Sequence, residues 1–81
     1  MATLVTGSSR GIGKAIAKRL ALSGHSLVLH ASKESPELQA TAKLLGAAVV
    51  GTVTGDLSDP RNVFKVYDSA RGLAMIDRLV N

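Results

Sequence analysis

The sequence predicts an α/β fold in which a parallel sheet is doubly wound, with helices on both of its faces. Three observations predict it. Short apolar runs alternate with stretches of helical periodicity, and the joints between them are short. A capping residue followed by proline stands at two of these joints, Ser35-Pro36 and Asp59-Pro60. Because such alternation is typical of βαβ units with right-handed crossovers, we expect the strand order 3-2-1-4.

Four strands are expected where apolar and β-branched residues follow one another. They are residues 2–6, residues 26–31, residues 47–54 and a strand that begins near Met75. The third run, Ala-Ala-Val-Val-Gly-Thr-Val-Thr, is rich in residues that favour a pleated surface.

Three helices are expected between these strands, over residues 11–23, 36–45 and 60–72. In the first of them, apolar residues recur at a spacing of four. Ser35 and Asp59 are the expected N-caps of the other two, each followed by proline at the first helical position. Gly24 and Gly46 follow the first two helices, where glycine commonly ends a helix.

The composition is that of one small folded domain without metal-binding thiolates. The 81 residues are 46% hydrophobic and contain no cysteine, which excludes disulfides and is consistent with a reducing cytoplasm. We expect no membrane segment, because no apolar run approaches spanning length, and no signal peptide, because the first strand begins at once. The net charge of +4 is scattered and not interleaved with aromatic residues, so nucleic acid is not an expected partner.

The glycines after the first strand predict a phosphate-binding turn. Residues 6–13 read Thr-Gly-Ser-Ser-Arg-Gly-Ile-Gly, with a strand before them and a helix pattern after them. Gly7 allows a tight turn with positive φ, Gly11 allows the backbone to approach a ligand, and Gly13 allows the helix to pack close to the strand. Free N–H groups at the start of a helix attract a phosphate.

The glycine spacing, with Asp56-Leu57 after the third strand and the final residues 76–81, resembles the compact type of the short-chain dehydrogenase/reductase family. Within that family, Gly-Ser-Ser-Arg-Gly-Ile-Gly most resembles the 3-oxoacyl-(acyl carrier protein) reductase type. The resemblance implies a Rossmann-type sheet that is incomplete. Residues 1–81 would be the N-terminal cofactor-binding part of a single domain, truncated at the fourth strand. The final residue, Asn81, would match the first Asn of the family's Asn-Asn-Ala-Gly element, as a structural residue.

The same resemblance implies NADP(H) as the cofactor. Relatives that prefer NAD carry an acidic residue at the end of the second strand, where this chain has Ala31. Arg10 and Ser32, joined by Lys33, would instead bind a 2′-phosphate. The alternative is that the two cations are solvated surface residues, and Glu34 would oppose the phosphate if it pointed inward.

The remaining cofactor contacts are also carried over from the family. Asp56 would accept a hydrogen bond from the adenine amine, and Leu57 would cover one face of the ring. The alternative for Asp56 is a helix cap. Ser9 would bond to the loop or to a phosphate, Ile12 would offer its backbone N–H to the pyrophosphate, and Thr6 would brace the fourth strand.

No catalytic residue is expected within this chain. The family's serine, tyrosine and lysine would lie beyond it, so the 81 residues alone should be inactive. Tyr67 and Arg71 have a suggestive spacing, but they lie before the fourth strand, and an arginine cannot shuttle a proton as a lysine does. His25 and His30 are expected to be structural or surface residues.

The expected function is NADPH-dependent reduction of a ketone or aldehyde, with a 3-oxoacyl thioester as one candidate substrate. The expected partners are a small carbonyl or hydroxyl compound and further copies of the whole protein, in a dimer or tetramer. The alternative is a non-catalytic nucleotide-binding half-fold, or an interaction module completed by another chain.

Overall fold

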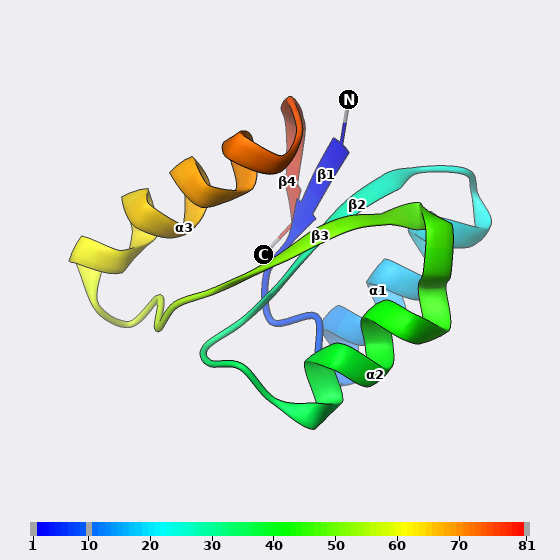
Figure 1. The fold of residues 1–81 in the computed structure, drawn as a ribbon, viewed down its shortest axis with the longest axis horizontal. Helices are drawn as coiled ribbons and strands as arrows, with labels where there is room; N and C mark the ends of the chain where they lie inside the picture. Colours follow the sequence, from blue (N-terminus) through cyan, green and yellow to red (C-terminus); the bar gives the residue numbers. More distant parts are fainter. Residues whose placement is uncertain (1, 10, 81) are drawn as a thin grey trace.

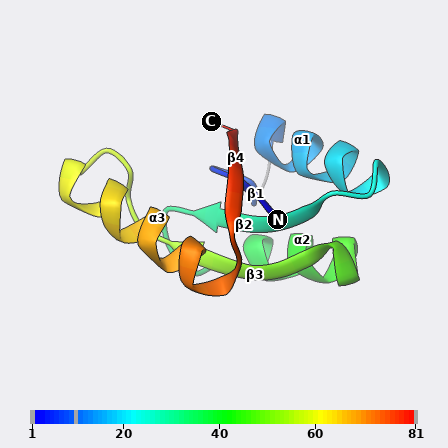
Figure 2. The ribbon, with the colours of Figure 1, turned by 90° about the horizontal axis from the view of Figure 1, so that it is seen from above.

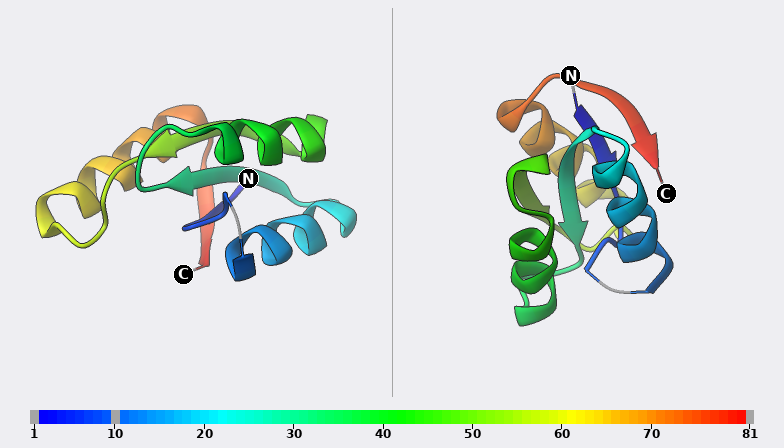
Figure 3. Two further views of the ribbon diagram at one scale, coloured as in Figure 1. Left: turned by 90° about the horizontal axis from the view of Figure 1, so that it is seen from below. Right: turned by 90° about the vertical axis from the view of Figure 1, so that its right-hand side faces the viewer.

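The computed structural model describes residues 2–9 and 11–80. Its four strands form one parallel sheet in the order β3-β2-β1-β4, as the sequence predicts (Figure 1). The strands are β1 (Ala2–Val5), β2 (Ser26–Ala31), β3 (Val49–Thr54) and β4 (Ile76–Val80). The short β1 is therefore central, and β4 lies beside it at the edge of the sheet (Figure 3).

The helices lie on both faces of this sheet. They are α1 (Gly11–Leu22), α2 (Pro36–Leu45) and α3 (Pro60–Leu73). Figure 2 shows α3 apart from α1 and α2, and the packing assigns them to opposite faces. Val66 of α3 packs against Leu4 and Val28. On the other face, Ala17 of α1 and Leu38 of α2 form a second apolar cluster with buried residues of β1 and β2.

The helix ends follow from local chemistry. The Ser35 hydroxyl accepts a hydrogen bond from the Leu38 amide at 3.1 Å, and the Asp59 carboxylate accepts one from the Arg61 amide at 3.0 Å. Both expected N-caps are thus confirmed. Beyond α1, Gly24 has φ 87°, its amide donates to Ala21, and the His25 amide donates back to Leu20. This is the glycine-terminated Schellman arrangement, which satisfies carbonyls at the end of the helix.

Several predicted boundaries are wrong by one or two residues. β1 ends at Val5 and not at residue 6, and α1 ends at Leu22 and not at residue 23. β3 begins at Val49 and not at residue 47, because residues 46–48 form a 3₁₀ turn (η1, Gly46–Ala48) closed by a bond from the Val49 amide to the Gly46 carbonyl. α3 continues to Leu73, one residue past the predicted end. Alanine composition alone does not distinguish such a turn from the start of a strand.

Thr6 joins the first and last strands although it lies just outside β1. Its amide and its hydroxyl both donate to the carbonyl of Val80, at 2.9 and 3.2 Å. The predicted bracing of the fourth strand by Thr6 is confirmed. Over residues 2–9 and 11–80, none of the helices has the length and apolar character needed to cross a membrane.

Candidate functional site

The candidate site lies where the carboxyl ends of β1, β2 and β3 meet. An open hollow of about 510 Å³ lies there, and ligands of open parallel sheets bind at this edge. It is lined by Thr6, Gly7, Ser9, His30, Ala31, Ser32, Asp56, Leu57 and Ser58. Three loops that are distant in the sequence therefore contribute to a single surface.

The glycine turn forms one side of this hollow. Gly7 and Gly11 have φ values of 60° and 65°, a region that side chains with a Cβ rarely adopt. Gly13 lies beneath the turn. A Cβ at Gly13 would lie 2.7 Å from the carbonyl carbon of Gly7 and closer still to its oxygen. The first turn of α1 can therefore approach β1 this closely only because Gly13 has no side chain.

Two residues that the sequence reasoning did not assign to the site hold the turn in place. Ser8 is fully buried, and its amide donates to the His30 carbonyl at 2.8 Å. The Ser8 hydroxyl accepts from the His30 amide at 2.9 Å and donates to the His30 carbonyl at 3.2 Å. The Gly7 amide donates to Nδ1 of His30 at 3.0 Å. His30 is thus structural, as expected, but it contacts the predicted phosphate turn directly.

A second hollow of about 330 Å³ lies beside the first, at the end of β2. It is lined by Ser9, Ala31, Ser32, Lys33, Ser35 and Glu37, and shares Ser9, Ala31 and Ser32 with the first. The hydroxyl of Ser32 and the ammonium of Lys33 belong to exposed residues here. A negatively charged group that extended from the first hollow would meet both of them.

Two carboxylates near the second hollow bear on its charge. Glu34, the residue that could oppose a phosphate, accepts a hydrogen bond from the side-chain amide of Gln39 on α2. Glu37 lines the hollow and was not considered in the sequence analysis. Its backbone carbonyl accepts from the Thr41 hydroxyl at 2.9 Å, and that hydroxyl also donates to the Ser9 carbonyl at 3.0 Å. Thr41 thereby links α2 to the glycine turn.

Asp56 and Leu57 form the wall opposite the glycine turn. One carboxylate oxygen of Asp56 accepts from the Ser58 hydroxyl at 2.7 Å and from the Ser58 amide at 2.9 Å. These two bonds hold the pKa of Asp56 below its usual value, so the group stays ionised. The helix-cap alternative for Asp56 is wrong, because Asp59 caps α3. Leu57 is half-buried and packs against the cluster beneath α3.

The predicted contact of Ile12 is through its backbone N–H and stays a prediction. The side chain of Ile12 is 81% exposed, and neither Ile12 nor Gly11 lines the two hollows. Arg10 and Asn81 lie outside the described residues. Within residues 2–9 and 11–80, no group of three histidine, aspartate or glutamate side chains could hold a metal ion.

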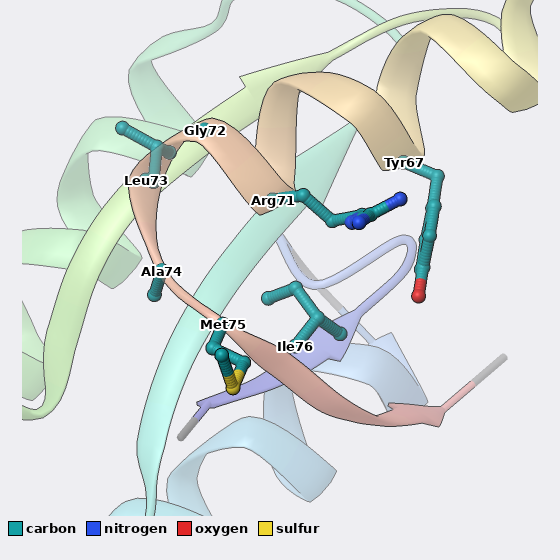
Figure 4. Close-up of a pocket in the computed structure, with 7 residues that line it drawn as sticks. All are labelled: Tyr67, Arg71, Gly72, Leu73, Ala74, Met75 and Ile76. Carbon is teal, nitrogen blue, oxygen red and sulfur yellow. The ribbon is translucent and has the colours of Figure 1, made fainter.

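The suggestive pair Tyr67 and Arg71 lies elsewhere. The Arg71 guanidinium stacks over the Tyr67 ring, 5.7 Å from its centroid. Both side chains line an open hollow of about 610 Å³ formed by the end of α3 and the start of β4 (Figure 4). Because parallel strands bind ligands at their carboxyl ends, this position supports the rejection of the pair as catalytic groups.

Comparison with known proteins gives one family. The family model of the short chain dehydrogenases matches residues 1–81. The chain is 39% identical over 79 residues to the 3-oxoacyl-[acyl-carrier-protein] reductase of Escherichia coli, covering 96% of this chain and 32% of that protein. It therefore spans about a third of the length of this relative.

Two solved structures share the fold closely. A 3-oxoacyl (acyl-carrier-protein) reductase from Agrobacterium tumefaciens C58 with NADP bound superposes with a TM-score of 0.84 at 36% identity, over 96% of this chain and 31% of that one. YwfH, an NADPH dependent reductase involved in bacilysin biosynthesis, superposes with a TM-score of 0.86 at 28% identity, over 99% of this chain and 35% of that one.

Proposed function

Because this chain belongs to the short-chain dehydrogenase family of nicotinamide-dependent oxidoreductases, we propose that it is the NADP(H)-binding part of a reductase acting on a ketone or aldehyde. The observation that carries the proposal is the pair of adjoining hollows beside the glycine turn, which meet at Ser9, Ala31 and Ser32. A 3-oxoacyl thioester is the first substrate class to test, since two of the similar proteins are reductases of that name.

The side chains at the site fit a nucleotide with a 2′-phosphate. The first hollow offers an ionised acceptor, Asp56, and an apolar surface, Leu57, for an adenine ring. The second offers the Ser32 hydroxyl and the Lys33 ammonium, which form charge-assisted bonds to a phosphate. Bound NADPH would supply a hydride; the described residues bind and orient the nucleotide.

The direct test is binding and turnover by the 81-residue chain. We expect NADPH fluorescence to report binding about 10-fold or more tighter than that of NADH, since hydrogen bonds to a charged group contribute about 1.5–3 kcal/mol. We expect no reduction of a carbonyl substrate, because hydride transfer needs a positioned acid for the developing alkoxide. Tighter binding of NADH would contradict the cofactor proposal, and turnover would mean that the chain holds an acid not recognised above.

The adenine contact predicts a second result. Asp56→Ala should bind NADPH about 10-fold more weakly, because a hydrogen bond to a charged group is lost. Asp56→Asn should bind with an affinity between those of wild type and Asp56→Ala, since its amide oxygen can still accept but carries no charge. An NADPH analogue in which unsubstituted purine replaces adenine lacks the exocyclic amine, and its affinity should be the same for all three proteins. If Asp56→Ala weakens both nucleotides equally, the loop and not the adenine contact is responsible.

The pKa of Asp56 sets the pH range of this contact. Because the pKa of Asp56 is lowered in the folded state, its carboxylate stays charged to a lower pH than that of an ordinary aspartate. Any contribution to stability is present above the unfolded pKa and is lost as the pH falls through the folded pKa. The ionisation of Asp56 should therefore not alter this contact between roughly pH 5 and roughly pH 8.

A second candidate is an interaction module completed by another chain. The outer side of β4 and the neighbouring face of α3 favour it, because Leu79 is 50% exposed and Phe64 is 77% exposed. An unpaired strand edge beside apolar surface invites pairing with a further chain. We propose separately that the whole reductase is a cytoplasmic homo-oligomer, a dimer or tetramer.

This exposed edge predicts that the 81-residue chain self-associates. Sedimentation velocity should show species larger than a monomer, with a fraction that rises with protein concentration. Leu79→Lys places a charge on the edge strand and should shift the distribution toward the monomer. Arg78→Lys, on the same strand, is the matched control and should leave the distribution unchanged. A monomer at all concentrations would contradict the prediction.

A further inference from the structure

His30 lies between two loops of the candidate site, and both of its ring nitrogens are engaged. The residue is 4% exposed. The Gly7 amide donates to Nδ1 at 3.0 Å, and Nε2 lies 2.8 Å from the Gly55 carbonyl oxygen. A backbone N–H can only donate and a carbonyl can only accept. The partners therefore assign the neutral ring with its proton on Nε2, which donates to Gly55.

This ring joins the two sides of the hollow. Gly7 belongs to the turn after β1, and Gly55 follows β3 directly before Asp56. The Gly7 amide already donates its hydrogen bond to the histidine, so it is not a donor for a ligand. The bond from the Gly7 amide to the ring instead fixes the turn relative to the loop that follows β3 and carries Asp56. The next residue of the turn, Ser8, is held by bonds of its amide and its hydroxyl to the backbone of His30.

We infer that His30 is the positioning residue of the glycine turn, and that protonation of its ring releases the turn. A proton on Nδ1 would replace the acceptor by a donor that faces the Gly7 N–H. The charged ring would also lie almost entirely out of solvent, which is costly for an unpaired charge. The consequence for nucleotide binding rests on the proposed function, whereas the release of the turn does not.

Among the residues that the structure describes, few charged groups lie near this ring. Asp56 shares the hollow with it, and remains ionised because of its two bonds from Ser58. Lys33 and Glu37 line the adjoining hollow. The described residues of the turn, Thr6–Ser9, carry no ionisable side chain, and the α3 residues that pack beneath this part of the sheet are Val66 and Ala70. Among the described residues, the ring is thus the ionisable group that contacts the turn directly.

The first measurement needs no nucleotide and no variant. Nitrogen-15 spectra of the wild-type imidazole distinguish the two neutral tautomers, and the Gly7 amide resonance can be followed in the same samples. We expect an Nε2–H ring in the neutral state and, as the samples are acidified, a Gly7 shift that changes together with protonation of the ring. An Nδ1–H ring, or a Gly7 resonance that stays the same when the ring is protonated, would overturn the inference.

Two variants of His30 separate the bond to Gly7 from the bond to Gly55. His30→Asn places an amide oxygen near the Nδ1 position, so an acceptor for Gly7 is kept that cannot be protonated. His30→Gln places an amide near the Nε2 position, so the bond to Gly55 is kept and the Gly7 partner is lost. At roughly pH 8, we expect His30→Asn to bind NADPH within about 3-fold of wild type and His30→Gln about 10-fold more weakly, because a buried donor is left unsatisfied.

The pH profile then separates positioning from packing. The phosphate of NADPH also titrates near pH 6, so affinities are compared as the ratio of wild type to His30→Asn at each pH. We expect this ratio to fall about 10-fold or more as the pH is lowered, because only the wild type loses its acceptor. A constant ratio would overturn the inference. If no protein binds NADPH while Gly7 still follows the ring, the proposed function fails and the positioning role stands.

Discussion

Replacing Gly13 by valine is expected to abolish nucleotide binding and to lower the free energy of unfolding by about 3 kcal/mol or more, the upper range for overpacking. The obstacle is backbone, since a Cβ would lie 2.7 Å from the Gly7 carbonyl carbon. A flexible side chain could move aside, but here the turn itself must move. Gly13→Ala should already cost about 2 kcal/mol for the same reason. Urea denaturation and NADPH titration of the same samples measure both effects.

Gly72→Ala is the matched control for this experiment. Gly72 lies in the last turn of α3, and a Cβ there would meet nothing within 4 Å. Alanine is the better helix former, so this variant should be more stable than wild type by about 0.5–1 kcal/mol, with unchanged binding. If Gly13→Ala were as stable as Gly72→Ala, the close packing of α1 on the turn would be contradicted.

Replacing Ala31 by aspartate is expected to reverse the cofactor preference. Ala31 lines both hollows, so a carboxylate there would face the 2′-phosphate of NADPH and could accept from the ribose hydroxyl of NADH. We expect the ratio of NADPH to NADH affinity to fall about 100-fold, from the loss of a charge-assisted interaction and the gain of a repulsion. Titration of the two reduced nucleotides gives the ratio directly.

The burial of Ala31 requires a control for size. The residue is 5% exposed and packs with the apolar cluster under α1 and α2, so any larger side chain will destabilise the fold. Ala31→Asn adds the same volume without the charge. It should lower both affinities together and leave their ratio within about 3-fold of wild type, since a neutral amide neither repels the phosphate nor binds it strongly. A matching reversal in Ala31→Asn would show that shape, not charge, selects the cofactor.

Much of this fold is predictable because its signals are local. Ser35 and Asp59 cap their helices through bonds to residues two or three positions ahead, so the sequence pattern contains the whole interaction. Gly24 ends α1 through bonds within the same turn. The strand order follows from chain alternation and handedness, which are general rules. For the site, the glycine spacing indicated the turn, and Gly13 has the close approach that this spacing predicts.

The parts that escaped prediction depend on distant residues. His30 bonds to Gly7 and to Gly55, which are 23 and 25 positions away, so nothing beside it in the sequence indicates its role. The bond from Thr41 to Ser9 spans 32 positions and is equally hidden. Asp56 carries a third kind of signal. Its bonds to Ser58 are local, but an aspartate two residues before a serine is as consistent with a loop as with a cap.

The pairing of β1 with β4 has a consequence for the order of folding. Thr6 and Val80 are neighbours in space but 74 positions apart in sequence, so the pairing of β1 with β4 closes a loop that spans nearly all of the described residues. Loop closure costs entropy that non-local pairing must first overcome, so we expect such contacts to form late. The residues that line the hollow beside the glycine turn all precede residue 59. We therefore expect the lining of this hollow to assemble on β1, β2 and β3 before the last strand docks, and local opening of that strand to release Thr6 from Val80.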